Sequence, residues 1–286
     1  MTSSNAALAE QGPAVRTGSG WASGLWRASM ARSSVELKSF FRNKQSLFFT
    51  LLLPIVLLLV LGSIFSGTVP GTHTDFKQMF VAGIIACGIM SVSFNGLAIN
   101  IAIERDNGMI RRLASSPMPK TAYFVGKIVR VVVTGILEAA ILLVVGVVLF
   151  HLPLPPNPAH WATFLWVLLL GATACSLLAV AFSTAIPNAR SAPAIVTLPF
   201  LVLQFISGVF FPYSQLPAWM QTIAAVFPLK WMTQGLRSVF LPADFALVEP
   251  AGTWELGRTA AVLAAWCVAA LLLSLLTFRW RGANVR

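Results

Sequence analysis

Long apolar runs dominate the chain and are separated by short polar stretches. A transmembrane helix needs about 20 predominantly apolar residues, so runs of this length predict membrane spans rather than buried helices of a soluble core. We expect an all-α membrane protein in which residues 46–280 form a transmembrane domain of six helices. The expected spans are residues 47–66, 78–102, 122–150, 161–185, 192–211 and 259–279.

The positions before the first span follow a helical period. Residues 1–20 are mainly small and polar, which predicts a disordered cytoplasmic tail. Over residues 21–45 we expect an amphipathic helix at the membrane surface, with its basic side chains toward anionic headgroups. It serves as a plain anchor for the first span or also as one side of a docking surface, and the two roles are compatible. Its apolar face contains Trp26, Met30, Leu37, Phe40 and Phe41, and its other faces contain Arg27, Arg32, Lys38 and Arg42.

A short apolar stretch follows the fifth expected span and lies between Pro217 and Pro228. It is too short to cross a bilayer, and backbone that turns back at membrane depth must be enclosed by protein. We therefore expect residues 213–228 to form an extracellular re-entrant helical hairpin. Aromatic side chains suited to the membrane–water boundary accompany it, at Tyr213, Trp219 and Trp231.

Charge fixes the expected orientation. The chain is 57% hydrophobic and only 10% charged, with a formal net charge of +11. With the N-terminus in the cytoplasm, the inner segments hold 16 Lys and Arg and the outer ones hold 4, in agreement with the positive-inside rule. This distribution favours a plasma-membrane protein with both termini cytoplasmic, including the tail 281–286, and disfavours a nucleic-acid partner. The four outer basic residues are Lys77, Lys230, Arg237 and Arg258.

One strongly charged segment interrupts the apolar pattern between the second and third spans. The sequence ERDNGMIRRLASSPMPKTAYFVGK, residues 104–127, holds two acidic and five basic residues. Such a segment must lie in water, so we expect a cytoplasmic helix over residues 104–116 that ends before Pro117 and contacts another chain. A solvated loop that only sets the topology is the alternative.

Motifs for nucleotide, metal or catalytic chemistry do not accompany this segment. The Gly126–Lys127 pair lacks the Gly and the Ser or Thr of a phosphate-binding loop. The three cysteines fall in apolar runs, and the three histidines lack the spacing of a helical metal site. We expect no enzymatic activity and no cofactor bound by this chain, so an ATP-driven process would place ATP and Mg²⁺ on a partner.

Polar groups inside the spans are candidates for a translocation path. Asn95 favours an interhelical hydrogen bond, with contact to a transported ligand as the alternative. Glu138 is the only acidic residue well inside a span. It either attracts cationic substrates or relays a proton, or it is a protonated or hydrogen-bonded structural group. Gln204 and Phe205 of the fifth span complete the set.

The charged segment resembles a known family. Its pattern resembles the first cytoplasmic loop of ABC-2 type transporter permeases, the membrane subunits of daunorubicin-resistance-type exporters. A second stretch, at 207–229, is similar to the fifth span and outer hairpin of the same family, and the order of elements agrees over residues 25–280. Met109-Ile110 and Ser116 depart mildly from the family pattern. The first pattern is Glu104-Arg105-Asp106-x-Gly108-x-x-Arg111-Arg112-Leu113-x-x-Ser116-Pro117-x-Pro119-Lys120-x-x-Tyr123-x-x-Gly126-Lys127.

The resemblance implies half of a transporter that resembles type V ABC exporters. Two permease copies, identical or homologous, would form the path among membrane lipids, and two ATP-binding subunits would drive it. The expected activity is export of hydrophobic or amphipathic compounds from a bacterial cell. Export of a lipid or polysaccharide is the alternative within the family, and a secondary carrier or a membrane scaffold is the alternative outside it. The resemblance implies that the ATPase-coupling residues are Glu104, Arg105, Asp106, Gly108, Arg111, Arg112 and Pro117.

Overall fold

A computed structural model describes residues 19–65, 67–116, 118–155 and 157–278, and this part of the chain is built from helices. The expected tails, 1–20 and 281–286, lie outside the described residues, except that 19 and 20 begin α1. The helices are α1 Ser19–Arg42, α2 Lys44–Ile64, α3 Phe76–Met90, η1 Ser91–Gly96, α4 Leu97–Asp106, α5 Met109–Ala114, α6 Lys120–Phe150, α7 Pro158–Ser183, α8 Ala192–Ile206, η2 Tyr213–Gln215, α9 Ala218–Val226, α10 Pro228–Phe240, η3 Ala243–Val248 and α11 Leu256–Thr277.

Within the described residues five stretches of helix are long and apolar enough to cross a membrane, so the expectation of a helical membrane protein is confirmed. They are α2, the continuous α3–η1–α4 rod, α6, α7 and α11. The fifth expected span, 192–211, contains only the 15-residue α8. At 1.5 Å per residue α8 rises about 22 Å, less than the roughly 30 Å of hydrocarbon in a bilayer. It ends early because Gly208 turns the chain with a φ of 77°.

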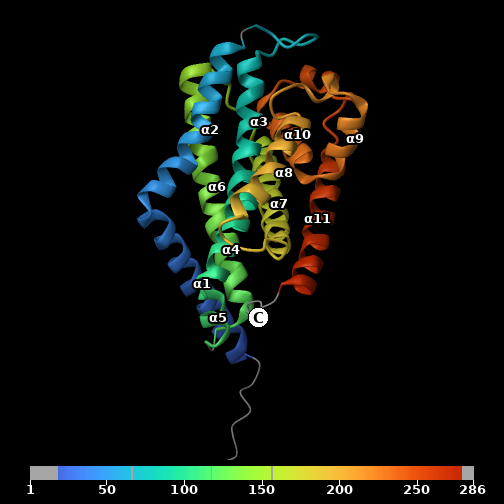
Figure 1. Cartoon of the computed structure of the whole chain (residues 1–286). Helices are drawn as coiled ribbons and strands as arrows, with labels where there is room; N and C mark the ends of the chain where they lie inside the picture. The colour runs from blue at the N-terminus through green and yellow to red at the C-terminus, as the bar shows by residue number, and fades with distance from the viewer. Residues whose placement is uncertain (1–18, 66, 117, 156, 279–286) are drawn as a thin grey trace, which may run out of the picture.

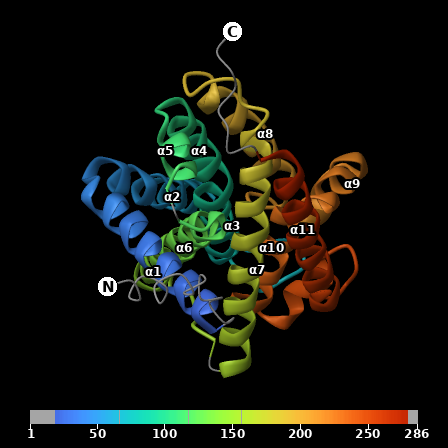
Figure 2. The same cartoon turned by 90° about the horizontal axis from the view of Figure 1, so that it is seen from below.

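The α3–η1–α4 rod forms the centre of the bundle. In the most apolar window of this rod 83% of the residues are buried, against 17% in α2 and 22% in α11. Helices α2, α6, α7 and α10 surround α3 (Figures 1 and 2). Close packing of this rod depends on small residues. A Cβ atom on Gly83 would lie 2.3 Å from the Val209 carbonyl oxygen, and one on Gly88 would lie 2.2 Å from Glu138 Oε1.

Helix α10 is enclosed by the rest of the chain, and all of its residues are buried. The sequence analysis counted Lys230 and Arg237 as charges of an outer loop, but the structure buries both within α10. Arg237 Nη1 lies 3.4 Å from Glu249 Oε1, and its Nη2 donates to the Gly208 carbonyl. The expected hairpin over 213–228 therefore comprises η2 and α9, and the buried helix α10 follows it.

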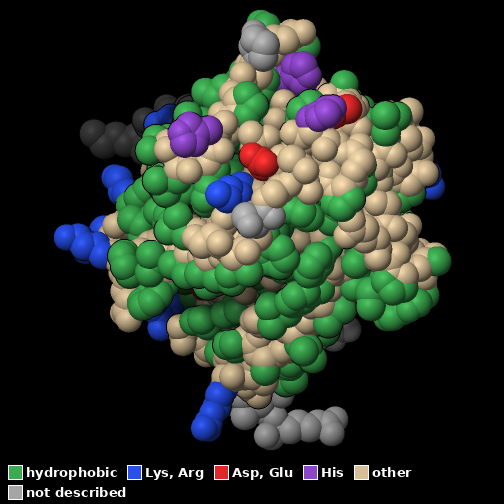
Figure 3. All heavy atoms as spheres, turned by 90° about the horizontal axis from the view of Figure 1, so that it is seen from above, with side chains coloured by type: hydrophobic (Ala, Val, Ile, Leu, Met, Phe, Trp, Pro, Cys, Tyr) green, Lys and Arg blue, Asp and Glu red, His purple; other side chains and the backbone are tan. Residues whose placement is uncertain are grey.

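The two ends of the bundle differ in character. The start of α1, the end of α11 and the α4–α5 turn lie at one end, whereas α9 and α10 lie toward the other (Figure 1). Histidine side chains lie on the face seen from above, with few acidic or basic groups around them (Figure 3). Among the described residues no group of three or more His, Cys, Asp or Glu side chains is arranged to hold a metal ion.

Candidate functional site

The charged segment forms a tight turn between two helices. Helix α4 ends at Asp106, and Gly108 adopts a left-handed conformation with a φ of 71° before α5 begins. The stretch expected as one helix, 104–116, is thus two helical pieces. Glycine suits this position because a side chain at positive φ meets the backbone carbonyl.

Helix α5 presents basic side chains outward. Arg111 and Arg112 are exposed, whereas Ile110 is buried and anchors the helix to the bundle. Pro117, which the sequence analysis expected to end this segment, lies outside the described residues. The result is a short projecting helix with a cationic tip and an apolar base.

The charged residues at the end of α4 point away from the exposed side of α5. They are Glu104, Arg105 and Asp106. Arg105 Nη1 donates to the Ser183 carbonyl at 3.1 Å, and its Nη2 donates to the Ile186 carbonyl. Asp106 accepts a hydrogen bond from the backbone N–H of Ala189. Both side chains therefore contact the turn between α7 and α8, and Glu104 turns inward instead.

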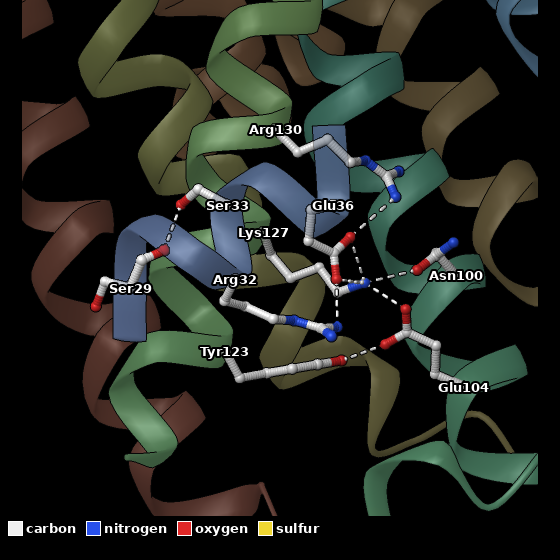
Figure 4. A network of polar contacts seen from close by, with 9 residues as sticks. All are labelled: Ser29, Arg32, Ser33, Glu36, Asn100, Glu104, Tyr123, Lys127 and Arg130. Carbon is white, nitrogen blue, oxygen red and sulfur yellow. Dashed lines mark hydrogen bonds and ion pairs between the residues drawn. The ribbon is translucent and has the colours of Figure 1, made fainter. Parts of the chain in front are cut away.

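A buried ionic network lies behind the turn and joins α1, α4 and α6 (Figure 4). The Lys127 ammonium lies 2.9 Å from Glu36 Oε1, donates to Asn100 Oδ1 at 2.9 Å and pairs with Glu104. The Tyr123 hydroxyl donates to Glu104 at 2.7 Å. Only 1% of the Lys127 side chain and 5% of the Glu36 side chain are exposed, so these charges depend on one another rather than on water.

Two arginines complete the network around Glu36. Arg32 pairs with it from one turn earlier in α1, and Arg130 Nη1 approaches it at 3.5 Å from α6. The stem of Arg32 lies close to Gly126, where a Cβ atom would come within 2.7 Å of Arg32 Cγ. Two carboxylates and three cations thus fix α1 against the first turns of α6, at the base of the charged turn.

Helix α1 faces the bundle with its polar side. Ser29, Arg32, Ser33 and Glu36 are buried, whereas Trp26 is 68% and Met30 52% exposed. The expectation that Arg32 faces lipid headgroups is wrong. Beside a membrane domain the apolar phase is the lipid, so apolar side chains such as Trp26 and Met30 can face outward while buried polar groups find partners in protein. Phe40 of the expected apolar face is nevertheless buried, and Arg27, Lys38 and Arg42 remain exposed. The Arg32–Glu36 pair at i,i+4 was the signal in the sequence that could have shown this.

The four candidate path residues lie on three elements. Asn95 of η1 accepts a hydrogen bond from the Thr197 hydroxyl of α8 at 3.1 Å, the interhelical role considered for it. Glu138 of α6 is buried against Gly88, and Gln204 of α8 is buried as well. Phe205 is 55% exposed and packs on Phe210, with ring centroids 5.2 Å apart.

The fold and this arrangement of charges define a multi-pass helical membrane protein. The chain belongs to the ABC-2 type transporter family, whose pattern it matches over residues 29–241. That match includes most of α1, the charged turn and α10.

Curated relatives carry transport names. The chain is 23% identical over 173 residues to the "Probable multidrug ABC transporter permease YbhR" of Escherichia coli strain K12, which covers 59% of this chain and 45% of that protein. The chain thus spans about half the length of that relative. It is 22% identical over 215 residues to the ycf38 protein of Porphyra purpurea, described as a transport permease, covering 73% of this chain and 72% of that protein. These similarities agree with membership of the ABC-2 type transporter family.

Proposed function

We propose that this chain is the membrane subunit of an exporter driven by a separate ATP-binding subunit that docks on α5. The observation that carries the proposal is a projecting helix with exposed Arg111 and Arg112 whose base is fixed by a buried ionic network. A rigid base allows a displacement of α5 to reach the spans, and exposed cations give register to a contact. The family match supports an ATP-binding partner of this kind.

The orientation belongs to the same proposal. The end that carries the α4–α5 turn faces the cytoplasm, where ATP is, and both termini lie on that side. The excess of basic residues assigned to these segments supports this orientation. In the proposed arrangement the short helix α8, fifth in chain order, joins the five longer spans as a transmembrane element. A second permease copy, identical or homologous, completes the path in a bacterial plasma membrane.

The proposed cargo is a hydrophobic or amphipathic compound, in keeping with the multidrug name of one relative. The partner would bind ATP and Mg²⁺, and this chain would supply the path, with Glu104, Arg105, Asp106, Gly108, Arg111, Arg112 and Pro117 around the coupling contact. Export of a lipid or polysaccharide is a second candidate, because family membership holds for both cargo classes.

Reconstitution into vesicles tests the proposal. The chain would be purified with and without the ATP-binding subunit encoded beside it, and ATP hydrolysis and uptake of a fluorescent amphipathic cation into inside-out vesicles would be measured. We expect uptake only with both subunits and ATP, and a catalytically inactive ATPase should abolish it. Transport by this chain alone, driven by an ion gradient, would refute the ATP-driven mechanism and favour a secondary carrier.

A further inference from the structure

The two charged residues at the end of α4 bind the next cytoplasmic turn of the same chain. Arg105 donates to the carbonyls of Ser183 and Ile186, which lie at the end of α7 and just after it. The last carbonyls of a helix lack intrahelical donors, and the Ser183 carbonyl accepts the Ile186 N–H at 3.3 Å as well as the guanidinium. One planar side chain thereby holds two points of the turn.

Asp106 holds the other side of this turn. Its Oδ2 accepts the backbone N–H of Ala189, and its Oδ1 lies 3.7 Å from Arg105 Nε. Ala189 lies three residues before α8, and Asn188 Oδ1 accepts the backbone N–H of Ser191 at 2.9 Å. The contacts of Arg105 and Asp106 therefore extend from the end of α7 to the start of α8.

A second link joins the same two elements deeper in the bundle, where Asn95 and Thr197 share their hydrogen bond. Beyond the α3–η1–α4 rod, α8 packs chiefly on α9 and α10. Its outer face is exposed, with Leu198, Val202 and Phe205 more than half accessible. The N-terminal part of α8, which begins at Ala192, is thus attached to the bundle mainly through α4 and η1.

We propose that Arg105 and Asp106 are positioning residues that make the start of α8 move together with α4 and α5. This inference rests on the proposed function and deepens it. It separates these two residues from the ATPase contact, which it leaves to α5, and it makes α8 the span that responds when α5 is displaced. The bidentate contact explains why arginine is needed, because a lysine ammonium lacks the planar fork that reaches both carbonyls.

The structural half of the proposal is tested on the purified chain alone. Amide hydrogen exchange would be measured for residues 184–191 in the unaltered chain and in the variants Arg105→Lys and Asp106→Asn. Asp106→Asn keeps an acceptor oxygen for the Ala189 N–H but removes its charge, and Arg105→Lys removes the fork that reaches both carbonyls, so each variant should raise exchange within 184–191 several-fold. Arg190→Ala is the matched control, because it removes an exposed arginine from the same turn. Unchanged exchange in both variants would overturn the proposal without bearing on ATP-driven transport.

The functional half uses the assembled transporter. We expect Arg105→Lys and Asp106→Asn to keep ATPase binding and ATP hydrolysis but to lower ATP-dependent uptake several-fold, while Arg190→Ala leaves all three unchanged. Loss of ATPase binding in Arg105→Lys would place Arg105 in the docking contact and overturn the proposal, as would uptake equal to that of the unaltered chain. Failure of the unaltered chain to transport with ATP would instead refute the proposed function.

Discussion

At the scale of single residues, Lys127 holds the charged end of the bundle together. Its ammonium pairs with both Glu36 and Glu104. A buried pair is costly to create but far more costly to break, because the remaining partner is left charged and without water.

Replacing Lys127 with Met should therefore destabilise the protein strongly. We expect a loss of about 3–5 kcal/mol, as for other broken buried pairs. The double variant Lys127→Met, Glu104→Gln should recover much of it, because Glu36 keeps its contacts with Arg32 and Arg130 and a neutral amide at position 104 does not require a cation. Thermal unfolding in detergent measures both effects. A single variant as stable as the unaltered chain would contradict the account.

Lys230 of α10 predicts a pH dependence at the other end of the molecule. Burial lowers the pKa of its ammonium from 10.5 to about 8, although Glu249 and Glu255 favour the charged form. Helix α10 lies outside the candidate membrane spans. Between pH 8 and 10.5 the unfolded chain binds more protons at this lysine than the folded chain, so the free energy of unfolding should rise with pH.

Melting temperatures across that pH range provide the measurement. The rise contributed by Lys230 should disappear in the variant Lys230→Met, whereas Lys77→Met, which changes an outer lysine outside α10, should retain it. Identical pH profiles for the unaltered chain and Lys230→Met would show that the lysine stays protonated in the folded protein.

At the scale of elements, periodicity located the helices but not the direction in which they face. The pattern over 21–45 predicted an amphipathic helix, and α1 is one, yet its polar side is buried. A hydrophobic pattern separates two faces; whether the surrounding medium is water or lipid decides which face turns outward. The charged turn was recognised from residues 104–127, but its division at Gly108 and its contacts with the turn 184–191 depend on distant packing.

Gly83 of α3 packs directly against the backbone just after α8. Replacing Gly83 with Ala would place a methyl group 2.3 Å from the Val209 carbonyl oxygen, and a backbone atom cannot rotate away. We expect a loss of about 1–3 kcal/mol from overpacking. Gly135→Ala in α6 is the matched control, because its Cβ would have its nearest neighbour, Ile89 Cγ1, at 3.9 Å. Equal melting temperatures for the two variants would contradict this packing.

At the scale of the whole molecule, composition was sufficient to predict a helical membrane protein, but it could not fix the number of spans. An apolar run shows where a helix is tolerated in lipid and not where it ends. The run at 192–211 is divided by the turn at Gly208, so α8 is shorter than the run. Lys230 and Arg237 appeared to mark a loop because the sequence does not show that the protein encloses them, where Lys230 donates to Gln234 and Arg237 pairs with Glu249.

The docking proposal predicts an asymmetry between the two ends of the molecule. Reversing both charges of α5, with Arg111→Glu and Arg112→Glu, should reduce co-purification of the ATPase at least about tenfold, since repulsion across an interface costs more than 1.4 kcal/mol. Membrane insertion should be unaffected. The matched control reverses Lys77 and Arg258 at the other end, and it should leave binding intact. Normal ATPase binding by the α5 variant would refute the docking role.

The residues of the buried ionic network are synthesised in a fixed order. The ribosome makes Glu36 first, Glu104 next and Lys127 last, so both carboxylates precede the ammonium that neutralises them. A nascent chain halted before α6 carries two acidic groups whose lysine does not yet exist, and α1 has nothing to hold it against the bundle. Completion of α6 is then the step that supplies the cation for both carboxylates and fixes α1 against the bundle, before α7 to α11 are added.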